Sequence, residues 1–199
     1  MAVTRDQLLA VLNAQRAAFT AELPVSAAVR KDRLKRAIAL LVDHGDAFCK
    51  AMSEDFGHRS HEQSMMTDIT TSIRVLKATI KQVDQWMKPE KRKAEFPLGL
   101  LGAKAAVEFQ PKGVIGIISP RNFPVQLTMG PLTGAFAAGN RVMVKSSEYT
   151  PTVAELFETV GPQYFSKEEA AFFSGGPEVG QAFAGLPFDH ILFTGATGV

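Results

Sequence analysis

The spacing of hydrophobic residues changes near residue 88. Before that point, apolar residues recur three and four positions apart, as in DQLLAVLNAQRAAF and RLKRAIALLVDHGDAFCKAM, which is typical of amphipathic helices. Thr4 or Asp6 can cap a first helix, and Ser26 can begin a second. A long third helix is predicted over HEQSMMTDITTSIRVLKATIKQVDQWM and ends at Pro89. Residues 1–88 are therefore predicted to form an N-terminal helical region.

A connector is predicted over residues 89–112. PLGLLGAKAAVEFQPKG is rich in glycine and proline, and its alternating stretch AAVEFQP indicates an edge strand or one arm of a hairpin. The basic patch KPEKRK also contains a proline and a glutamate. We interpret this patch as a solvated connector rather than a binding site for a polyanion.

From residue 113 onward, apolar runs of strand length alternate with helical segments. The runs are VIGIIS, RVMVKS, EAAFFSG and HILFTG, and helices are expected at about 125–138, 150–160 and 177–184. Strands without polar alternation, separated by helices, predict a parallel sheet that is covered on both faces. The expected fold class is α/β, a helical region followed by a doubly wound, mostly parallel, Rossmann-like sheet. Because FTGATGV ends in a strand-to-helix turn, we expect a truncated chain with a partial dinucleotide-binding domain over 113–199.

Composition and charge exclude several classes of protein. The chain has 199 residues and 46% hydrophobic content, enough for a substantial core. Its 22 basic and 20 acidic residues give a net charge of +2, which argues against nucleic acid as a partner. The N-terminal stretch MAVTRDQLLA is charged at Arg5 and Asp6 and contains no apolar run of the length expected for a signal peptide or membrane span. With a single cysteine, Cys49, and therefore no intrachain disulfide, we expect a cytoplasmic protein.

The stretch SPRNFP, which follows the first apolar run, is the first candidate site. Ligands of open α/β sheets bind at the carboxyl ends of the strands, so residues just after such a run are candidates. The side-chain amide of Asn122 can stabilise an oxygen that becomes negative during attack on a carbonyl. Alternatively, this is a rigid turn in which Asn122 bonds to the backbone. Sequence spacing does not decide between the two readings.

The stretch KSSE, after the second apolar run, is another candidate. Lys145 and Glu148 can together bind two adjacent hydroxyls, the ammonium donating and the carboxylate accepting hydrogen bonds. The alternative is a helix cap formed by Ser146 or Ser147, with Lys145 solvated.

Two glycine-rich stretches, SGGPEVG and FTGATG, follow the third and fourth apolar runs. Glycines before a helix allow a diphosphate to approach backbone N–H groups, although neither stretch has the GxGxxG spacing and glycine often serves only the backbone. The histidines show no metal-ligand spacing and are interpreted as surface or core residues; they are His44, His58, His61 and His190.

Four stretches, taken in order, resemble the cofactor-binding half of the aldehyde dehydrogenase superfamily. They are VEFQPKGVIGIISPRNFP, AAGNRVMVKSSEYTP, SGGPEVG and FDHILFTGATGV. The resemblance is specific over residues 107–199 and compatible over 1–88. The phrases PQYF, FDHI and LFTG resemble the branch that contains class 3 and coniferyl aldehyde dehydrogenases.

The resemblance implies roles for individual residues. Asn122 would hold the aldehyde oxygen and the thiohemiacetal oxyanion. Lys145 and Glu148 would contact the adenosine ribose of NAD, with NADP also open, although Glu148 would repel a 2′-phosphate. The complete set of residues expected to contact the cofactor is Ser119, Pro120, Lys145, Glu148, Gly176, Gly180, Phe193 and Gly195. Two positions depart from the family pattern, since Arg121 stands where tryptophan is usual and Ala196 where many members have serine.

The nucleophile of the family does not match Cys49. Family chemistry uses a cysteine thiolate and a glutamate, both expected beyond Val199, whereas Cys49 lies in the helical region and is interpreted as a buried small hydrophobe. The sequence therefore predicts the N-terminal portion of an NAD(P)-dependent dehydrogenase for coniferyl or another bulky apolar aldehyde. This chain alone is expected to be inactive, and the full-length form to be a homodimer. The alternatives are a non-catalytic nucleotide-binding or regulatory module, or a fragment that persists through self-association.

Overall fold

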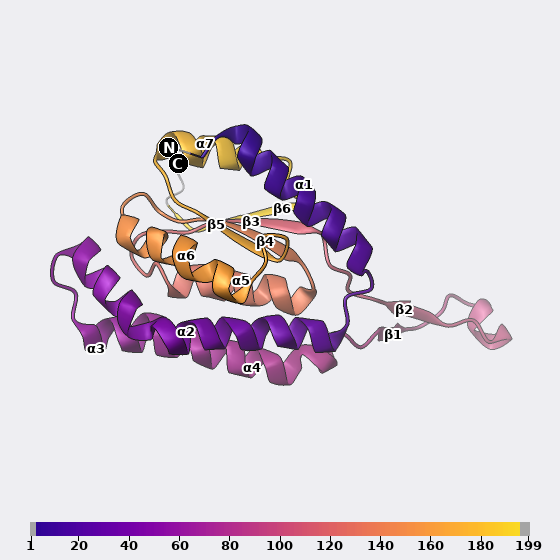
Figure 1. The fold of residues 1–199 in the computed structure, drawn as a ribbon. Coiled ribbons are helices and arrows are strands. Elements are labelled where there is room, and N and C mark those ends of the chain that lie inside the picture. Colours follow the sequence, from indigo (N-terminus) through magenta and orange to yellow (C-terminus); the bar gives the residue numbers. More distant parts are fainter. Residues whose placement is uncertain (1–2, 196–199) are drawn as a thin grey trace.

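A computed structural model describes residues 3–195, and at its centre lies a four-stranded parallel sheet (Figure 1). The strand order is β5-β4-β3-β6. The chain therefore steps outward from β3 through β4 to β5 and then returns to the other side of β3, as in the dinucleotide-binding half of a doubly wound fold. The four strands are β3 (Val114–Ile118), β4 (Arg141–Lys145), β5 (Ala170–Phe173) and β6 (His190–Phe193).

Helices cover both faces of the sheet, which confirms the predicted fold class. In Figure 1, α1 and α7 lie on one face, while α5 and α6 lie on the other and are covered in turn by α2 and α4. The helices are α1 (Arg5–Glu22), α2 (Ala27–Phe56), α3 (His61–Ser64), α4 (Thr71–Trp86), α5 (Gln126–Ala138), α6 (Pro151–Tyr164) and α7 (Pro177–Ala184).

Alternate residues of β3, β4 and β5 contribute to two hydrophobic clusters. Ile115 and Ile117 join the cluster that contains residues of α2, α4, α5 and α6. Val114 and Met143 join the cluster that contains residues of α1 and α7. Gly116, which lies between Ile115 and Ile117 in β3, leaves room for the ring of Phe188. A Cβ added to Gly116 would lie 2.8 Å from that ring. Both faces of β3, β4 and β5 are thus buried, which explains why these strands lack polar alternation. The edge strand β6 is mostly exposed.

Local capping explains where the first two helices begin. The side chain of Thr4 accepts a hydrogen bond from the Gln7 amide, and the Gln7 side chain accepts one from the Thr4 amide, which forms a capping box. Ser26 accepts a hydrogen bond from Val29 and caps α2 as predicted.

The long third helix that was predicted is confirmed, since the chain is helical from His61 to Trp86. The sequence did not predict the π-helical segment η1 (Met65–Thr70), which lies between α3 and α4. Single π turns within helices are frequent at functional sites.

A two-stranded arm projects from the body (Figure 1). It consists of β1 (Glu90–Arg92) and β2 (Ala105–Val107), which pair antiparallel, with the 3₁₀ turn η2 (Leu98–Leu101) near its tip. The hairpin arm predicted from AAVEFQP is confirmed, and its partner strand comes from the basic patch. Phe96, Leu100 and Leu101 are exposed on this arm. No helix within residues 3–195 is long and apolar enough to cross a membrane.

Candidate functional site at the carboxyl edge of the sheet

The strand register brings the predicted motifs to one edge of the sheet. Ile118 is opposite Lys145 on one side and Phe193 on the other, and Lys145 is opposite Phe173. The ladder continues beyond the strand ends, since the Ser119 amide donates to the Lys145 carbonyl at 3.0 Å. All four strands therefore end at the same level, the edge at which ligands bind to open α/β sheets.

The loop between β3 and α5 carries Asn122. Ser119 is buried, and its Oγ accepts a hydrogen bond from the Thr128 hydroxyl at 2.8 Å. Pro120 is half-buried, and the side chain of Asn122 is exposed. The backbone carbonyl of Asn122 accepts a hydrogen bond from Arg59 Nη1 at 2.9 Å. The start of this loop is thus fixed to the sheet, while the amide of Asn122 remains accessible.

Two residues of the helical region, missed by the sequence analysis, hold this loop. Asp68 Oδ1 accepts hydrogen bonds from the amides of Val125 and Gln126, each at 3.1 Å. Asp68 Oδ2 accepts another from Arg59 Nη2 at 2.8 Å. The guanidinium of Arg59 lies 5.2 Å from the centroids of both the Phe56 and the Phe123 rings. A hollow of about 370 Å³ opens beside them, lined by Phe56, His58, Arg59, Gln63, Asn122 and Phe123.

Lys145 is buried at the end of β4. Its side chain is 2% exposed, and Nζ donates to the Ser146 carbonyl at 2.6 Å. Burial lowers the pKa of the Lys145 ammonium, against the opposing influence of Glu148, Glu178 and Glu158. The alternative in which Lys145 is merely solvated was therefore wrong. Glu148 is exposed three residues later.

The alternative in which a serine of KSSE caps α6 was also wrong, whereas the predicted start of this helix near residue 150 is confirmed. Neither Ser146 nor Ser147 begins the helix, because its N-cap residue is Thr150. The orphan amides of the first turn, those of Thr152 and Val153, donate instead to the Asp55 carboxylate, each at 3.0 Å. Asp55 lies on α2, so sequence local to α6 could not reveal this cap.

The glycines have distinct geometries. Gly176 is the N-cap residue of α7, and Gly180 has open space where a Cβ would lie. The preceding Gly175 has φ +125°, a conformation that favours glycine and that the sequence analysis did not assign to it. An added Cβ on Gly195 would lie 2.2 Å from the ring of Phe193, a residue exposed at the end of β6. Ala196 lies outside the described residues.

Arg121 connects two of the motifs. Its guanidinium lies 5.9 Å from the centroid of the Tyr149 ring, which follows Glu148. Because Arg121 and Tyr149 are both exposed, this contact forms part of the accessible surface of the carboxyl edge.

Cys49 lies in the core on α2. It is 1% exposed, and burial raises the pKa of its thiol to about 11. A thiol with so high a pKa is almost entirely protonated at neutral pH and is a poor nucleophile, which confirms the structural role predicted for it. Within residues 3–195, no cluster of His, Cys, Asp and Glu side chains could hold a metal ion.

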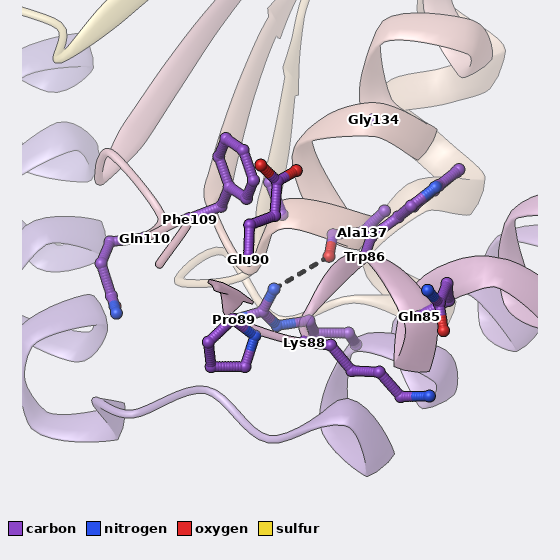
Figure 2. A pocket seen from close by; sticks show the side chains of 11 residues that line it. Gln85, Trp86, Lys88, Pro89, Glu90, Phe109, Gln110, Gly134 and Ala137 are labelled. Carbon is purple, nitrogen blue, oxygen red and sulfur yellow. Dashed lines mark hydrogen bonds between the residues drawn. The ribbon is translucent and has the colours of Figure 1, made fainter. Parts of the chain in front are cut away.

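A second hollow, of about 700 Å³, lies at the base of the arm rather than at the carboxyl edge (Figure 2). Trp86, Phe109 and Gly134 line it, and Arg30 donates to the Ala137 carbonyl at 3.1 Å beside it. None of the predicted site residues lines this hollow. The candidate site therefore remains at the strand ends.

Comparison with known proteins identifies similar chains. The model of the aldehyde dehydrogenase family matches residues 1–199. A "Probable coniferyl aldehyde dehydrogenase" of Caulobacter vibrioides is 53% identical over 190 residues, which is 95% of this chain and 39% of that protein. The "Coniferyl aldehyde dehydrogenase" of Pseudomonas sp. strain HR199 is 46% identical over 197 residues, covering 99% of this chain and 40% of that protein.

Solved structures have the same fold. The substrate-bound state of Staphylococcus aureus AldH superimposes with a TM-score of 0.85 at 28% identity, over 92% of this chain and 39% of that one. The chain thus spans about two fifths of the length of the relatives that it matches.

Proposed function

The chain belongs to the aldehyde dehydrogenase family, and on this premise we propose that it forms the cofactor-binding edge and half of the oxyanion hole for NAD(P)-dependent oxidation of an aldehyde to a carboxylic acid. The observation that carries the proposal is the convergence of the family motifs at one sheet edge, where Ser119, Lys145 and Phe193 are adjacent in register. The proposal extends to the full-length protein, which would supply the remaining chemistry.

The residues at the edge suit a dinucleotide. Ser146 Oγ is buried and has no hydrogen-bond partner within residues 3–195, and a buried polar atom of this kind favours a polar ligand. Lys145 and Glu148 are the residues proposed to hold the adenosine ribose, together with Gly176 and Gly180. Ser119, Pro120, Phe193 and Gly195 complete the proposed contacts. When bound, the nicotinamide accepts a hydride from the substrate.

We assign the cofactor as NAD rather than NADP. Glu148 is exposed next to the proposed ribose site, and its carboxylate would repel a 2′-phosphate.

Asn122 is the proposed oxyanion donor. Its exposed amide lies on a loop that is fixed by hydrogen bonds to Ser119 and to the Asn122 carbonyl, and preorganised donors of this kind stabilise negative charge as it develops. Cys49 is the only cysteine of the chain and is buried. The nucleophilic thiolate is therefore assigned to no residue of this chain, which on its own should be inactive.

Coniferyl aldehyde or another bulky apolar aldehyde is the proposed substrate. Its support is the similarity to a probable coniferyl aldehyde dehydrogenase and a coniferyl aldehyde dehydrogenase, which are 53% and 46% identical to this chain. We propose that the full-length protein is a cytoplasmic homodimer. The exposed apolar residues of the arm support self-association.

The test is an assay of the full-length protein for aldehyde-dependent reduction of NAD and NADP, with coniferyl aldehyde and acetaldehyde compared. We expect turnover with NAD and a preference for coniferyl aldehyde. Asn122→Ala should lower kcat by about a hundredfold, the usual cost of losing one oxyanion donor. Asn13→Ala, which changes an exposed asparagine on α1, is the matched control and should retain full turnover.

Two outcomes would contradict these assignments. Undiminished turnover in Asn122→Ala would remove the role of Asn122. Dinucleotide binding by a full-length protein that oxidises no aldehyde would favour the non-catalytic module instead.

A further inference from the structure

We propose that Arg59 and Asp68 are positioning residues that set the orientation of Asn122, an inference that rests on the proposed function. Neither side chain has to touch substrate or cofactor in this role. Together they form a buried ion pair that holds the Asn122 loop from the side of the helical region.

Asp68 holds one end of the Asn122 loop. Its side chain is 0% exposed, and its two oxygens have separate tasks. Oδ1 accepts the amides of Val125 and Gln126, which belong to the first turn of α5 and have no partner within that helix. A carboxylate at this place is also favoured by the positive end of the helix dipole. Asp68 therefore fixes the end of the Asn122 loop at which α5 begins.

Arg59 fixes the other end. Its side chain is 7% exposed, and its two terminal nitrogens donate to different groups. Nη1 donates to the Asn122 carbonyl, while Nη2 donates to Asp68 Oδ2 and to the Thr67 hydroxyl at 3.0 Å. A planar guanidinium holds these donors at fixed angles, which a lysine ammonium cannot do. The rings of Phe56 and Phe123 further restrict its position.

One ion pair thus restrains the backbone on both sides of Phe123. The restrained atoms are the carbonyl oxygen of Asn122 and the amide nitrogens of Val125 and Gln126. A rotation of the loop that redirected the Asn122 side chain would break hydrogen bonds to a buried charged pair. Loss of such bonds is costly because the charges would stay buried without partners.

The local fold of the helical region explains how Asp68 reaches the loop. Asp68 lies in η1, where the helix widens, and its backbone carbonyl accepts the Ser72 hydroxyl at 2.6 Å. The position in the fold is consistent with a role beyond packing, because π turns recur at functional sites.

Arg59→Lys in the full-length enzyme is the principal test. The variant keeps the positive charge beside Asp68 but loses the planar fork that also holds the Asn122 carbonyl. We expect kcat to fall by about tenfold to a hundredfold, since small displacements of a catalytic group cost this much, while the dissociation constant of NAD stays unchanged. Because Lys145 and Glu148 lie elsewhere on the edge, a selective loss of kcat separates positioning from cofactor binding.

Arg36→Lys is the matched control. Like Arg59, Arg36 is ion-paired, donates to a backbone carbonyl, that of Tyr164, and lies 5.2 Å from an aromatic centroid, that of Phe165. Its partners Tyr164 and Glu169 precede β5, at the opposite edge of the sheet from Asn122, and its third partner, Asp32, lies on α2 itself. Arg36→Lys should therefore retain kcat even where it lowers the melting temperature.

A double-mutant cycle distinguishes positioning from general destabilisation. In the Asn122→Ala background, Arg59→Lys should cause no further loss of kcat, because the group that it positions is already absent. An equal loss in both backgrounds, or an Arg59→Lys enzyme with wild-type kcat, would overturn the inference.

Asp68→Asn provides a second variant if Arg59→Lys does not fold. Its amide oxygen can still cap α5, whereas its NH₂ group would face the donors of Arg59, and we expect the same selective loss of kcat. A wild-type kcat in Asp68→Asn would contradict the positioning role but leave the proposed function intact. Wild-type protein that oxidises no aldehyde would instead remove the proposed function, and the positioning role with it.

Discussion

Glu169 should make the stability of the chain depend on acid. It precedes β5, and its side chain is 19% exposed between Arg33 and Arg36. Burial alone would raise the pKa of this carboxyl, but the hydrogen bonds and charges of Arg36 and Arg33 outweigh it and lower the pKa from 4.5 to about 2. The carboxylate is therefore bound more tightly to its partners in the folded state than to water in the unfolded state.

The sign and size of the effect follow from this pKa. Because the folded value is the lower one, the stabilisation is complete above the unfolded value and is lost as the pH falls toward about 2. Each tenfold change in proton affinity is worth about 1.4 kcal/mol, so Glu169 contributes about 3 kcal/mol at pH 7. Between pH 7 and pH 3, linkage predicts a loss of about 2 kcal/mol from this residue.

Urea unfolding of the wild type and Glu169→Gln, followed by circular dichroism at both pH values, measures this contribution. The difference in free energy of unfolding between the two proteins should be about 2 kcal/mol smaller at pH 3. Glu168→Gln changes a neighbouring exposed glutamate and should follow the wild type to within about 0.5 kcal/mol. If the wild type and Glu169→Gln lost the same free energy of unfolding between pH 7 and pH 3, the stabilising role of the Glu169 carboxylate would be refuted.

Three further predictions concern other parts of the structure. Asp55→Ala should destabilise the chain by about 1–2 kcal/mol, because α6 loses the carboxylate that accepts hydrogen bonds from its first amides. Urea unfolding measures this loss, and a midpoint equal to that of the wild type would contradict the prediction. Gly116→Ala should cost about 1–3 kcal/mol, since its Cβ would lie 2.8 Å from the Phe188 ring; thermal melting checks this value, and wild-type stability would contradict it. Cys49, buried and with a thiol pKa of about 11, should react with a disulfide reagent only after unfolding, so rapid labelling at pH 8 without urea would contradict its placement.

The sheet could be predicted because each strand is recognisable alone. VIGIIS, RVMVKS, EAAFFSG and HILFTG are apolar on both faces, and each coincides with an observed strand. The position at which α6 ends was predicted less accurately. The helix was expected to end near residue 160, yet it continues to Tyr164. Gly161 is needed for packing rather than for a helix end, since an added Cβ would lie 2.5 Å from the Phe172 ring.

The strand ends were predictable, but the contacts that hold their loops were not. Asn122 and Lys145 follow apolar runs, so local sequence marks them as candidates. Asp68 is 57 residues from Val125, and Asp55 is 97 residues from Thr152. In sequence, either aspartate reads as an ordinary polar residue of a helical region. Only the packing of that region against the sheet helices brings them to their partners.

These two aspartates indicate how the helical region contributes to the site. The amino ends of α5 and α6 point to the carboxyl edge, where exposed helix amides commonly bind anions. Asp68 occupies the amides of α5 and Asp55 those of α6. These amides already donate hydrogen bonds to carboxylates, so neither helix end is free to bind an anionic cofactor.

The two carboxylates differ in what surrounds them. Asp68 is fully buried and paired with Arg59, which also binds the Asn122 carbonyl. The cap of α5 is therefore coupled to the proposed oxyanion donor, whereas the cap of α6 is not. Loss of Asp55 should for this reason reduce stability without a selective fall in kcat, while Asp68→Asn should lower kcat at comparable stability. Kinetic and unfolding measurements on both variants of the full-length enzyme would separate the two roles, and equal kinetic losses would show that the caps act alike.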